Sequence, residues 1–114
     1  MNADRILIFI AGLAGAAGVA LSAAAAHAGG QNLQTAATFL LVHAPALLGA
    51  ALLAGRTARF SGFVLAAGLA LFCGDLLSRD FLGDRLFPYA APVGGMLLIG
   101  GWLVLAASAV FDRR

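Results

Sequence analysis

Four long apolar runs, separated by short charged stretches, constrain the fold of this chain more than any other feature. The runs cover residues 6–28, 33–54, 60–77 and 88–111. A helix needs about 20 residues to cross the hydrocarbon core of a bilayer, with a lower limit of about 17. All four runs reach this range. Because backbone polar groups in lipid must be hydrogen-bonded within their own segment, we expect each run to form a membrane-spanning helix.

The composition supports an integral membrane protein. Of 114 residues, 62% are hydrophobic and 11% are charged, and the mean hydropathy is +0.99. A soluble domain is about a quarter charged, so this chain has too little polar surface to cover a water-soluble globule. The same composition excludes intrinsic disorder. We expect one all-α transmembrane domain over residues 1–114. Because the links are short, its helices should form an up-down-up-down bundle.

The arginines predict an orientation in the membrane. In an up-down bundle one side carries most of the cations: Arg5, Arg56, Arg59, Arg113 and Arg114. The other side carries two arginines offset by two aspartates: Arg79, Arg85, Asp80 and Asp84. By the positive-inside rule, we expect a multi-pass protein of the bacterial inner membrane with both termini in the cytoplasm. The arginines form no continuous stripe, so we expect no nucleic-acid partner.

The first run also has features of a secretory signal peptide. Arg5 precedes a long apolar stretch, and Ala26-His27-Ala28 matches a small-residue cleavage pattern. The apolar stretch is longer than the roughly 7–15 residues of a signal-peptide core. We therefore expect the run to be retained as the first helix.

Small residues predict where the helices pack against each other. Lipid removes the hydrophobic reason for helices to associate, so close contact through small side chains matters. Two runs carry such residues along one face: Gly15, Gly18, Ser22, Gly94, Gly101 and Ser108. We interpret both faces as packing seams; the alternative is that they leave room for a flat cofactor or a lipid tail. Trp102 lies near the middle of its run, and we expect it to contact the protein core or a partner protein.

His43 is the most deeply placed ionisable residue of the predicted spans. At 1.5 Å per residue it lies about 15 Å along the second helix, where an ionisable side chain usually faces protein or a water cavity. Pro45 follows two residues later and can kink the helix. Two readings stay open. In the first, a neutral imidazole simply bonds to a neighbouring helix; in the second, the kink and the imidazole frame a site.

Three further residues complete a candidate intramembrane polar site with His43. Asp75 and Arg79 are four residues apart on one predicted helix, so they can form an ion pair at the membrane edge. His27 ends the first run on the same side. Joined to His43, these groups would offer ligands for a proton or a metal. The spacing matches no compact metal motif, so we expect no metal, no cofactor and no catalytic residues.

Several short motifs, in order, are similar to one known family. The first run ends in Ala25-Ala26-His27-Ala28-Gly29, and Phe39 precedes His43-Ala44. The later runs contain Leu71-Phe72-Cys73-Gly74-Asp75, Pro92-Val93-Gly94-Gly95 and Gly101-Trp102. With these motifs the chain resembles the bacterial domain-of-unknown-function 423 family, related to a small animal transmembrane protein. The resemblance implies a small four-helix inner-membrane protein and no particular activity. The chain departs from the family at Asp75, where serine is typical, at Pro45, and in a shorter link after His27.

Three classes of function remain open from the sequence. The leading hypothesis is a structural or accessory subunit that packs laterally against itself or against other membrane protein subunits. The alternative is a small proton-coupled transporter or channel acting as a homo-oligomer, with Asp75 as coupling acid and His43 lining the path. A third class, an enzyme or cofactor carrier, would use His27 and His43; we do not expect it.

Overall fold

Four helices joined by short links make up the computed structural model, which describes residues 2–113. They are α1 (Ala3–Ala28), α2 (Gln31–Leu52), α3 (Arg56–Phe81) and α4 (Ala90–Phe111). Each is long and apolar enough to cross a bilayer. The expected all-α class with four transmembrane helices is therefore confirmed, and residues 2–113 contain no strand.

Several helix ends differ from the ends of the apolar runs. The third run covers residues 60–77, whereas α3 extends past both of its ends and includes Arg56, Arg59 and Arg79. The apolar run marks the hydrocarbon core. The backbone hydrogen bonds continue beyond it into the interface, because long arginine side chains reach the polar layer from a helix end.

At one end, each of two helices stops inside its apolar run because the chain turns sharply at a non-glycine residue. Ala54 has a φ of 57° and Tyr89 a φ of 69°. Both values lie in the left-handed region, which an α-helix of L-residues cannot continue through. As a result α2 ends at Leu52, before the end of the run 33–54, and α4 begins at Ala90 instead of residue 88.

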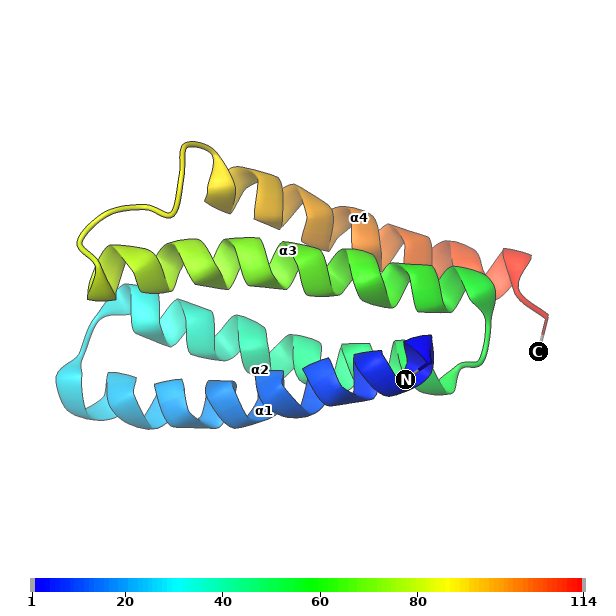
Figure 1. The fold of residues 1–114 in the computed structure, drawn as a ribbon, viewed down its shortest axis with the longest axis horizontal. Coiled ribbons are helices and arrows are strands. Elements are labelled where there is room, and N and C mark those ends of the chain that lie inside the picture. Colours follow the sequence, from blue (N-terminus) through cyan, green and yellow to red (C-terminus); the bar gives the residue numbers. More distant parts are fainter. Residues whose placement is uncertain (1, 114) are drawn as a thin grey trace.

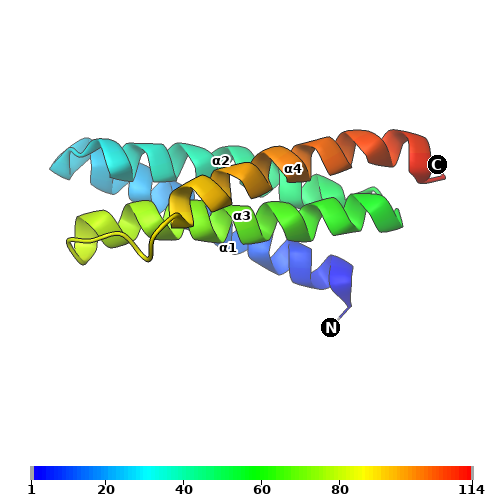
Figure 2. The same ribbon diagram turned by 90° about the horizontal axis from the view of Figure 1, so that it is seen from above.

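Each helix packs mainly on its neighbour in the chain. The large contacts are α1 on α2, α2 on α3 and α3 on α4, with a minor contact between α1 and α3. Figure 1 shows two hairpins, with the chain reversing direction at each link. Figure 2 shows α1 running at an angle to the other helices. The molecule is 46 Å long, so its ends extend beyond a hydrocarbon core of about 30 Å.

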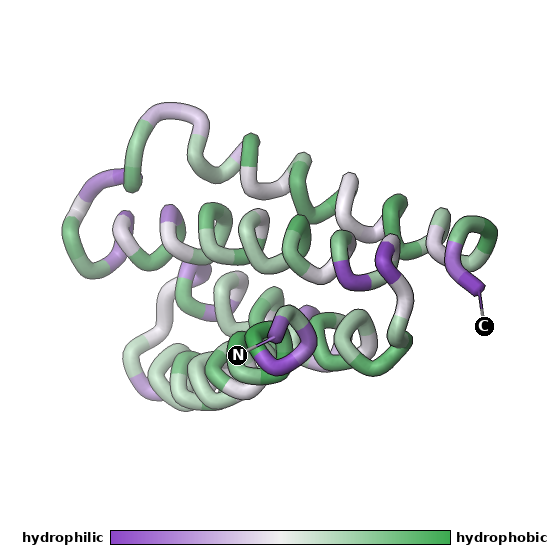
Figure 3. Tube along the Cα trace, turned by 45° about the vertical axis from the view of Figure 1, so that its right-hand side comes forward, coloured by the Kyte–Doolittle hydropathy of each residue, from purple (hydrophilic) through white to green (hydrophobic). Residues whose placement is uncertain are grey.

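The core is thin and lies between the two hairpins. Leu7, Leu47 and Leu65 are completely buried, and alanines fill much of the remaining space. In the most apolar stretch of each helix, 39% of the residues are buried in α2 and α3 but 22% in α1 and α4. Figure 3 shows hydrophobic colour along most of the helical trace and hydrophilic colour mainly near the ends. The outer helices thus direct most of their apolar surface away from the protein.

Glycines allow the closest approaches between helices. A Cβ atom on Gly94 would lie 2.6 Å from the backbone nitrogen of Phe72, and one on Gly101 would lie 2.7 Å from the Leu65 side chain. On Gly18 it would lie 2.8 Å from Leu41. Real Cβ atoms do not approach other heavy atoms so closely. At Gly94 the obstacle is backbone, so this contact requires glycine, whereas at Gly18 and Gly101 a leucine side chain would have to shift. The structure places Gly18, Gly94 and Gly101 at helix contacts.

The remaining small residues of the two predicted seams have less crowded surroundings. A Cβ on Gly15 would make an ordinary contact of 3.7 Å with Ala44. Ser22 is half-buried. Ser108 is buried, and its hydroxyl donates to the Leu105 carbonyl at 2.6 Å.

Two glycines at helix contacts were not predicted from the sequence. A Cβ on Gly62 would lie 2.8 Å from Leu7, and one on Gly68 would lie 2.8 Å from the Gly94 carbonyl oxygen. They are six residues apart on α3, so the two glycines by themselves do not mark one helix face. Their role depends on which helix packs against them.

Candidate functional site

His43 lies in the middle of α2 and joins that helix to α4. Its side chain is 5% exposed. The indole Nε1–H of Trp102 donates to His43 Nε2 at 3.1 Å, and His43 Nδ1 lies 2.8 Å from the Phe39 carbonyl oxygen. An indole N–H can only donate, so Nε2 must accept and the proton must sit on Nδ1, which donates to Phe39. This arrangement requires a neutral imidazole.

Aromatic rings surround this hydrogen-bonded pair. The Phe39 ring is stacked with His43, with centroids 5.8 Å apart, and contacts Phe72 of α3 at 4.5 Å. Beside them is an apolar groove of about 320 Å³, which Leu98 and Trp102 of α4 also line. Three helices therefore meet around one imidazole whose two ring nitrogens are both engaged.

Pro45 does not share the groove of His43. It is exposed on α2 and lines a different apolar groove together with Gly12 and other residues of α1. Pro45 has no N–H, so the Leu41 carbonyl lacks its usual helical donor, yet α2 continues through it to Leu52. The proline and the imidazole therefore frame no common site.

Asp75 forms the expected ion pair with Arg79 and a second bond that was not expected. Its side chain is 1% exposed. Oδ2 accepts from Arg79 Nε at 2.9 Å, and Oδ1 accepts from the backbone N–H of Leu86 at 2.8 Å. Nearby, the Ser78 hydroxyl donates to the Asp84 carbonyl oxygen at 2.7 Å. These bonds hold the link between α3 and α4 against the end of α3.

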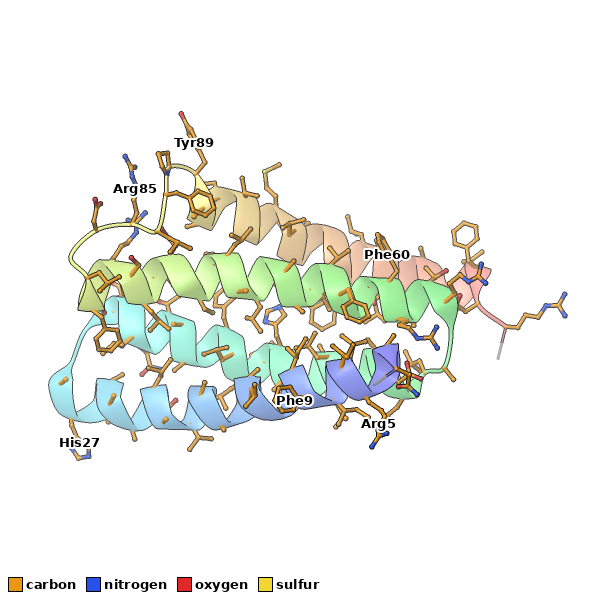
Figure 4. The ribbon with its side chains drawn as sticks, viewed as in Figure 1. Arg5, Phe9, His27, Phe60, Arg85 and Tyr89 are labelled. Carbon is orange, nitrogen blue, oxygen red and sulfur yellow. The ribbon has the colours of Figure 1, made fainter. Side chains whose placement is uncertain are left out.

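His27 lies apart from the other candidate residues. It is exposed near the end of α1, and Figure 4 shows its side chain pointing away from the bundle. The structure thus brings Asp75 and Arg79 together, and places His43 and His27 elsewhere. Within residues 2–113, no three His, Cys, Asp or Glu side chains are close enough to hold a metal ion.

A polar cluster at the opposite end of the molecule was missed by sequence analysis. Asp112, just after α4, accepts hydrogen bonds from the backbone N–H groups of Thr57 and Ala58 at 3.0 and 2.9 Å. It thereby caps α3, whose own N-cap residue Gly55 has no side chain to do so. Arg59 pairs with Asp4 at 2.9 Å. A glycine before a helix was the available signal, but it did not identify the capping residue.

The polar groups inside the bundle are engaged with one another. Among the described residues, every buried side-chain nitrogen and oxygen has a hydrogen-bond partner. His43 and Asp75 each use both of their polar side-chain atoms, one in a bond within its own helix and the other in a bond to a separate segment of the chain. These hydrogen bonds are suited to a structural role, in which they hold the helices and the α3–α4 link in place.

Comparison with known proteins places this architecture in context. A family model described as "Protein of unknown function (DUF423)" matches residues 9–95. The UPF0382 inner membrane protein YgdD of Escherichia coli is 29% identical over 123 residues, covering 97% of this chain and 94% of its own. A UPF0382 membrane protein of Staphylococcus epidermidis is 31% identical over 80 residues, covering 68% of this chain and 66% of its own. No solved structure matches this chain.

Proposed function

The chain belongs to the DUF423 family, as its motifs implied, and we propose that this multi-pass membrane protein is a structural or accessory subunit. In this role it packs laterally, within the inner membrane, against other membrane protein subunits or further copies of itself. The observation that carries the proposal is the sequential packing of the helices. α1 and α4 lie at the two edges, each packed mainly on a single neighbour.

Outward-facing glycines support lateral packing. Gly12 on α1 and Gly100 on α4 have no atom within 4 Å of the position of an added Cβ, apart from their own chain neighbours and helix backbone. In membranes, small residues on a helix surface let a second helix approach closely. Both outer helices therefore carry positions at which another helix can come near.

The engagement of the ionisable groups favours this role over proton-coupled transport. A coupling group must exchange its proton along a path through the protein. Asp75 is fixed by Arg79 and Leu86, and the hydrogen bonds of His43 need a neutral imidazole. Both side chains are explained by their bonds within the fold.

The experiment compares an outward-facing with an inward-facing glycine on the same helix. Native protein is extracted in mild detergent, sized, and analysed by mass spectrometry for co-purifying proteins. Gly100→Leu changes the outer face of α4, whereas Gly101→Leu collides with Leu65 inside the bundle. We expect Gly100→Leu, alone or with Gly12→Leu, to lose partners while keeping its thermal stability. Gly101→Leu should lose stability itself.

The result has two informative outcomes. Stoichiometric partners, or a defined homo-oligomer, that are lost on outward substitution support the accessory role. An assembly of unchanged size and composition in the Gly12→Leu/Gly100→Leu double variant contradicts it. Proton-coupled uptake in liposomes that disappears with Asp75→Asn or His43→Ala would establish the alternative transporter or channel.

The proposed orientation places both termini in the cytoplasm. The N-terminal end of α1, the α2–α3 link and the C-terminal end of α4 lie at the same end of the molecule (Figure 1). That end carries Arg5, Arg56, Arg59 and Arg113, against Asp4 and Asp112. The positive-inside rule assigns the arginine-rich end to the cytoplasm.

A further inference from the structure

The link between α3 and α4 is held in a defined shape. Its residues 82–89 are all exposed, yet its backbone is tied to α3 by the Leu86 N–H bond to Asp75 and the Ser78 bond to Asp84. Gly83 makes the turn with a φ of 80°, which favours glycine. Side chains on this link are therefore presented in fixed directions, which lowers the entropic cost of binding a ligand.

Two arginines line one hollow on this link. The hollow has a volume of about 370 Å³ and is bordered by Arg79, Gly83, Asp84 and Arg85. The Arg79 guanidinium is anchored through Nε to buried Asp75, while the side chain remains 45% exposed. Its terminal amino groups and the guanidinium of Arg85 have no bonding partner among residues 2–113. Figure 4 shows Arg85 projecting outward from the link.

The link must lie where lipid headgroups are. Because α3 and α4 both cross the membrane, the segment that joins them lies at a membrane surface. It exposes large apolar or amphipathic side chains beside its charges, including Leu82 at 79% and Tyr89 at 76%. Such side chains enter the boundary between headgroups and acyl chains. The hollow belongs to this same segment, so we expect it near the depth of the phosphate groups.

We propose that this hollow binds the headgroup of a zwitterionic phospholipid with a primary ammonium group, such as phosphatidylethanolamine. Arg79 and Arg85 hold the phosphate, because guanidinium groups match phosphate oxygens with paired N–H donors. Asp84 accepts from the ammonium: one of its oxygens is bonded to the Arg85 backbone N–H at 2.8 Å, and its other oxygen remains for the lipid.

The charge balance favours a zwitterion over an anionic lipid. Two cations, Arg79 and Arg85, are accompanied by two carboxylates, Asp75 and Asp84. A third carboxylate on the same end, Asp80, is bonded to Asn32 of α2. A ligand with both charges therefore matches the site, whereas a further net negative charge would be repelled. The inference holds whether the protein is a subunit or a transporter.

The test measures lipid retention. Purified protein in nanodiscs of equal parts phosphatidylethanolamine, phosphatidylglycerol and phosphatidylcholine is released in the gas phase, and bound lipids are counted by native mass spectrometry. We expect phosphatidylethanolamine to be retained most. Phosphatidylglycerol lacks the ammonium group, and the quaternary ammonium of phosphatidylcholine has no N–H to donate to Asp84.

Matched variants separate the site from general charge effects. Arg85→Gln should lower phosphatidylethanolamine retention about fivefold or more, as expected for a lost charge-assisted contact, and Arg85→Lys should restore part of it. Arg56→Gln removes the same charge at the opposite end and should leave retention unchanged. Asp84→Asn keeps an oxygen for the Arg85 backbone and should reduce the preference over phosphatidylcholine.

Three outcomes would overturn the proposal. They are equal retention of the three lipids, equal losses in Arg85→Gln and Arg56→Gln, and displacement of the lipid by millimolar inorganic phosphate alone, which would indicate a phosphate site without lipid recognition. Thermal unfolding of each variant in detergent verifies folding; Arg85 has no side-chain bond in the described structure, so its variants should melt like the parent protein.

Discussion

The imidazole of His43 is held between a carbonyl of its own helix and the one tryptophan of the chain. Packing and hydrogen bonding reinforce each other there, because Phe39 and Phe72 close around the ring. Asp75 has the same character at the membrane edge, where one carboxylate joins an arginine of α3 to the backbone of the next link. At both residues, two hydrogen bonds offset the free-energy cost of burying a polar side chain within a membrane protein.

At this scale we predict that Trp102→Phe destabilises the protein by about 1 kcal/mol, because it leaves buried Nε2 of His43 without a donor; interhelical bonds in membranes average about 0.6 and reach about 1.7 kcal/mol. Unfolding titrations in mixed detergent micelles measure the change. His43→Leu and the double variant complete a thermodynamic cycle. Strictly additive effects would show that the two side chains do not interact, and Phe60→Leu, at an exposed position, is the control.

Among the helices, α3 and α4 make the closest contact. Gly68 and Gly94 face each other so closely that the carbonyl oxygen of each limits the space at the other. Helices in lipid gain stability from such close van der Waals contact. The same two helices are joined at one end by the bonds from Asp75 and Ser78 to the link, and at the other by the cap from Asp112.

The neighbouring glycines of α4 give a matched prediction. Gly94→Ala should destabilise the protein by about 1–3 kcal/mol, because its Cβ would meet the Phe72 backbone and force the helices apart. Gly95→Ala meets no atom within 4 Å and should be neutral, or stabilising by up to about 1 kcal/mol, since alanine favours helix. The same unfolding titrations compare them. Equal effects of the two substitutions would argue against this helix contact.

Over the whole molecule, the helices form a sequential array with two exposed edge helices. The charged groups lie towards the two ends, where Arg59 pairs with Asp4 and Asn32 bonds to Asp80. Between these ends the outer surface is apolar and suited to lipid or to another membrane protein. The two ends differ in charge, and this difference is the basis of the proposed orientation in the membrane.

This difference predicts which end reacts with an impermeant reagent. A cysteine introduced in the α3–α4 link, as in Phe87→Cys, should react with a charged maleimide added to cells whose outer membrane is permeabilised and whose inner membrane is intact. Arg113→Cys should react only after the inner membrane is opened, because the proposed orientation puts the arginine-rich end in the cytoplasm. Native Cys73 is buried and serves as the unreactive background. The reverse pattern would invert the proposed orientation.

Much of this architecture follows from local sequence. Length and apolarity of a run suffice to predict a spanning helix, because the bilayer sets the length and the backbone must be bonded internally. The ion pair of Asp75 and Arg79 could equally be predicted from sequence, because two side chains four residues apart on a helix lie close together whatever surrounds them. The helix ends were less accurate, because turns at Ala54 and Tyr89 and arginines in the interface leave no hydropathy signal.

The partners of His43, the second bond of Asp75 and the cap on α3 could not be read from the chain. Trp102 lies 59 residues from His43 and Asp112 lies 55 from Thr57, and such contacts depend on which helices are neighbours and how each is rotated. The roles of Gly62 and Gly68 were hidden for the same reason. Sequence therefore established the membrane, the helices and the pairs within one helix, where geometry is set by the backbone. The contacts between helices depend on the packing of side chains that are distant in the chain, and they appear only in the folded molecule.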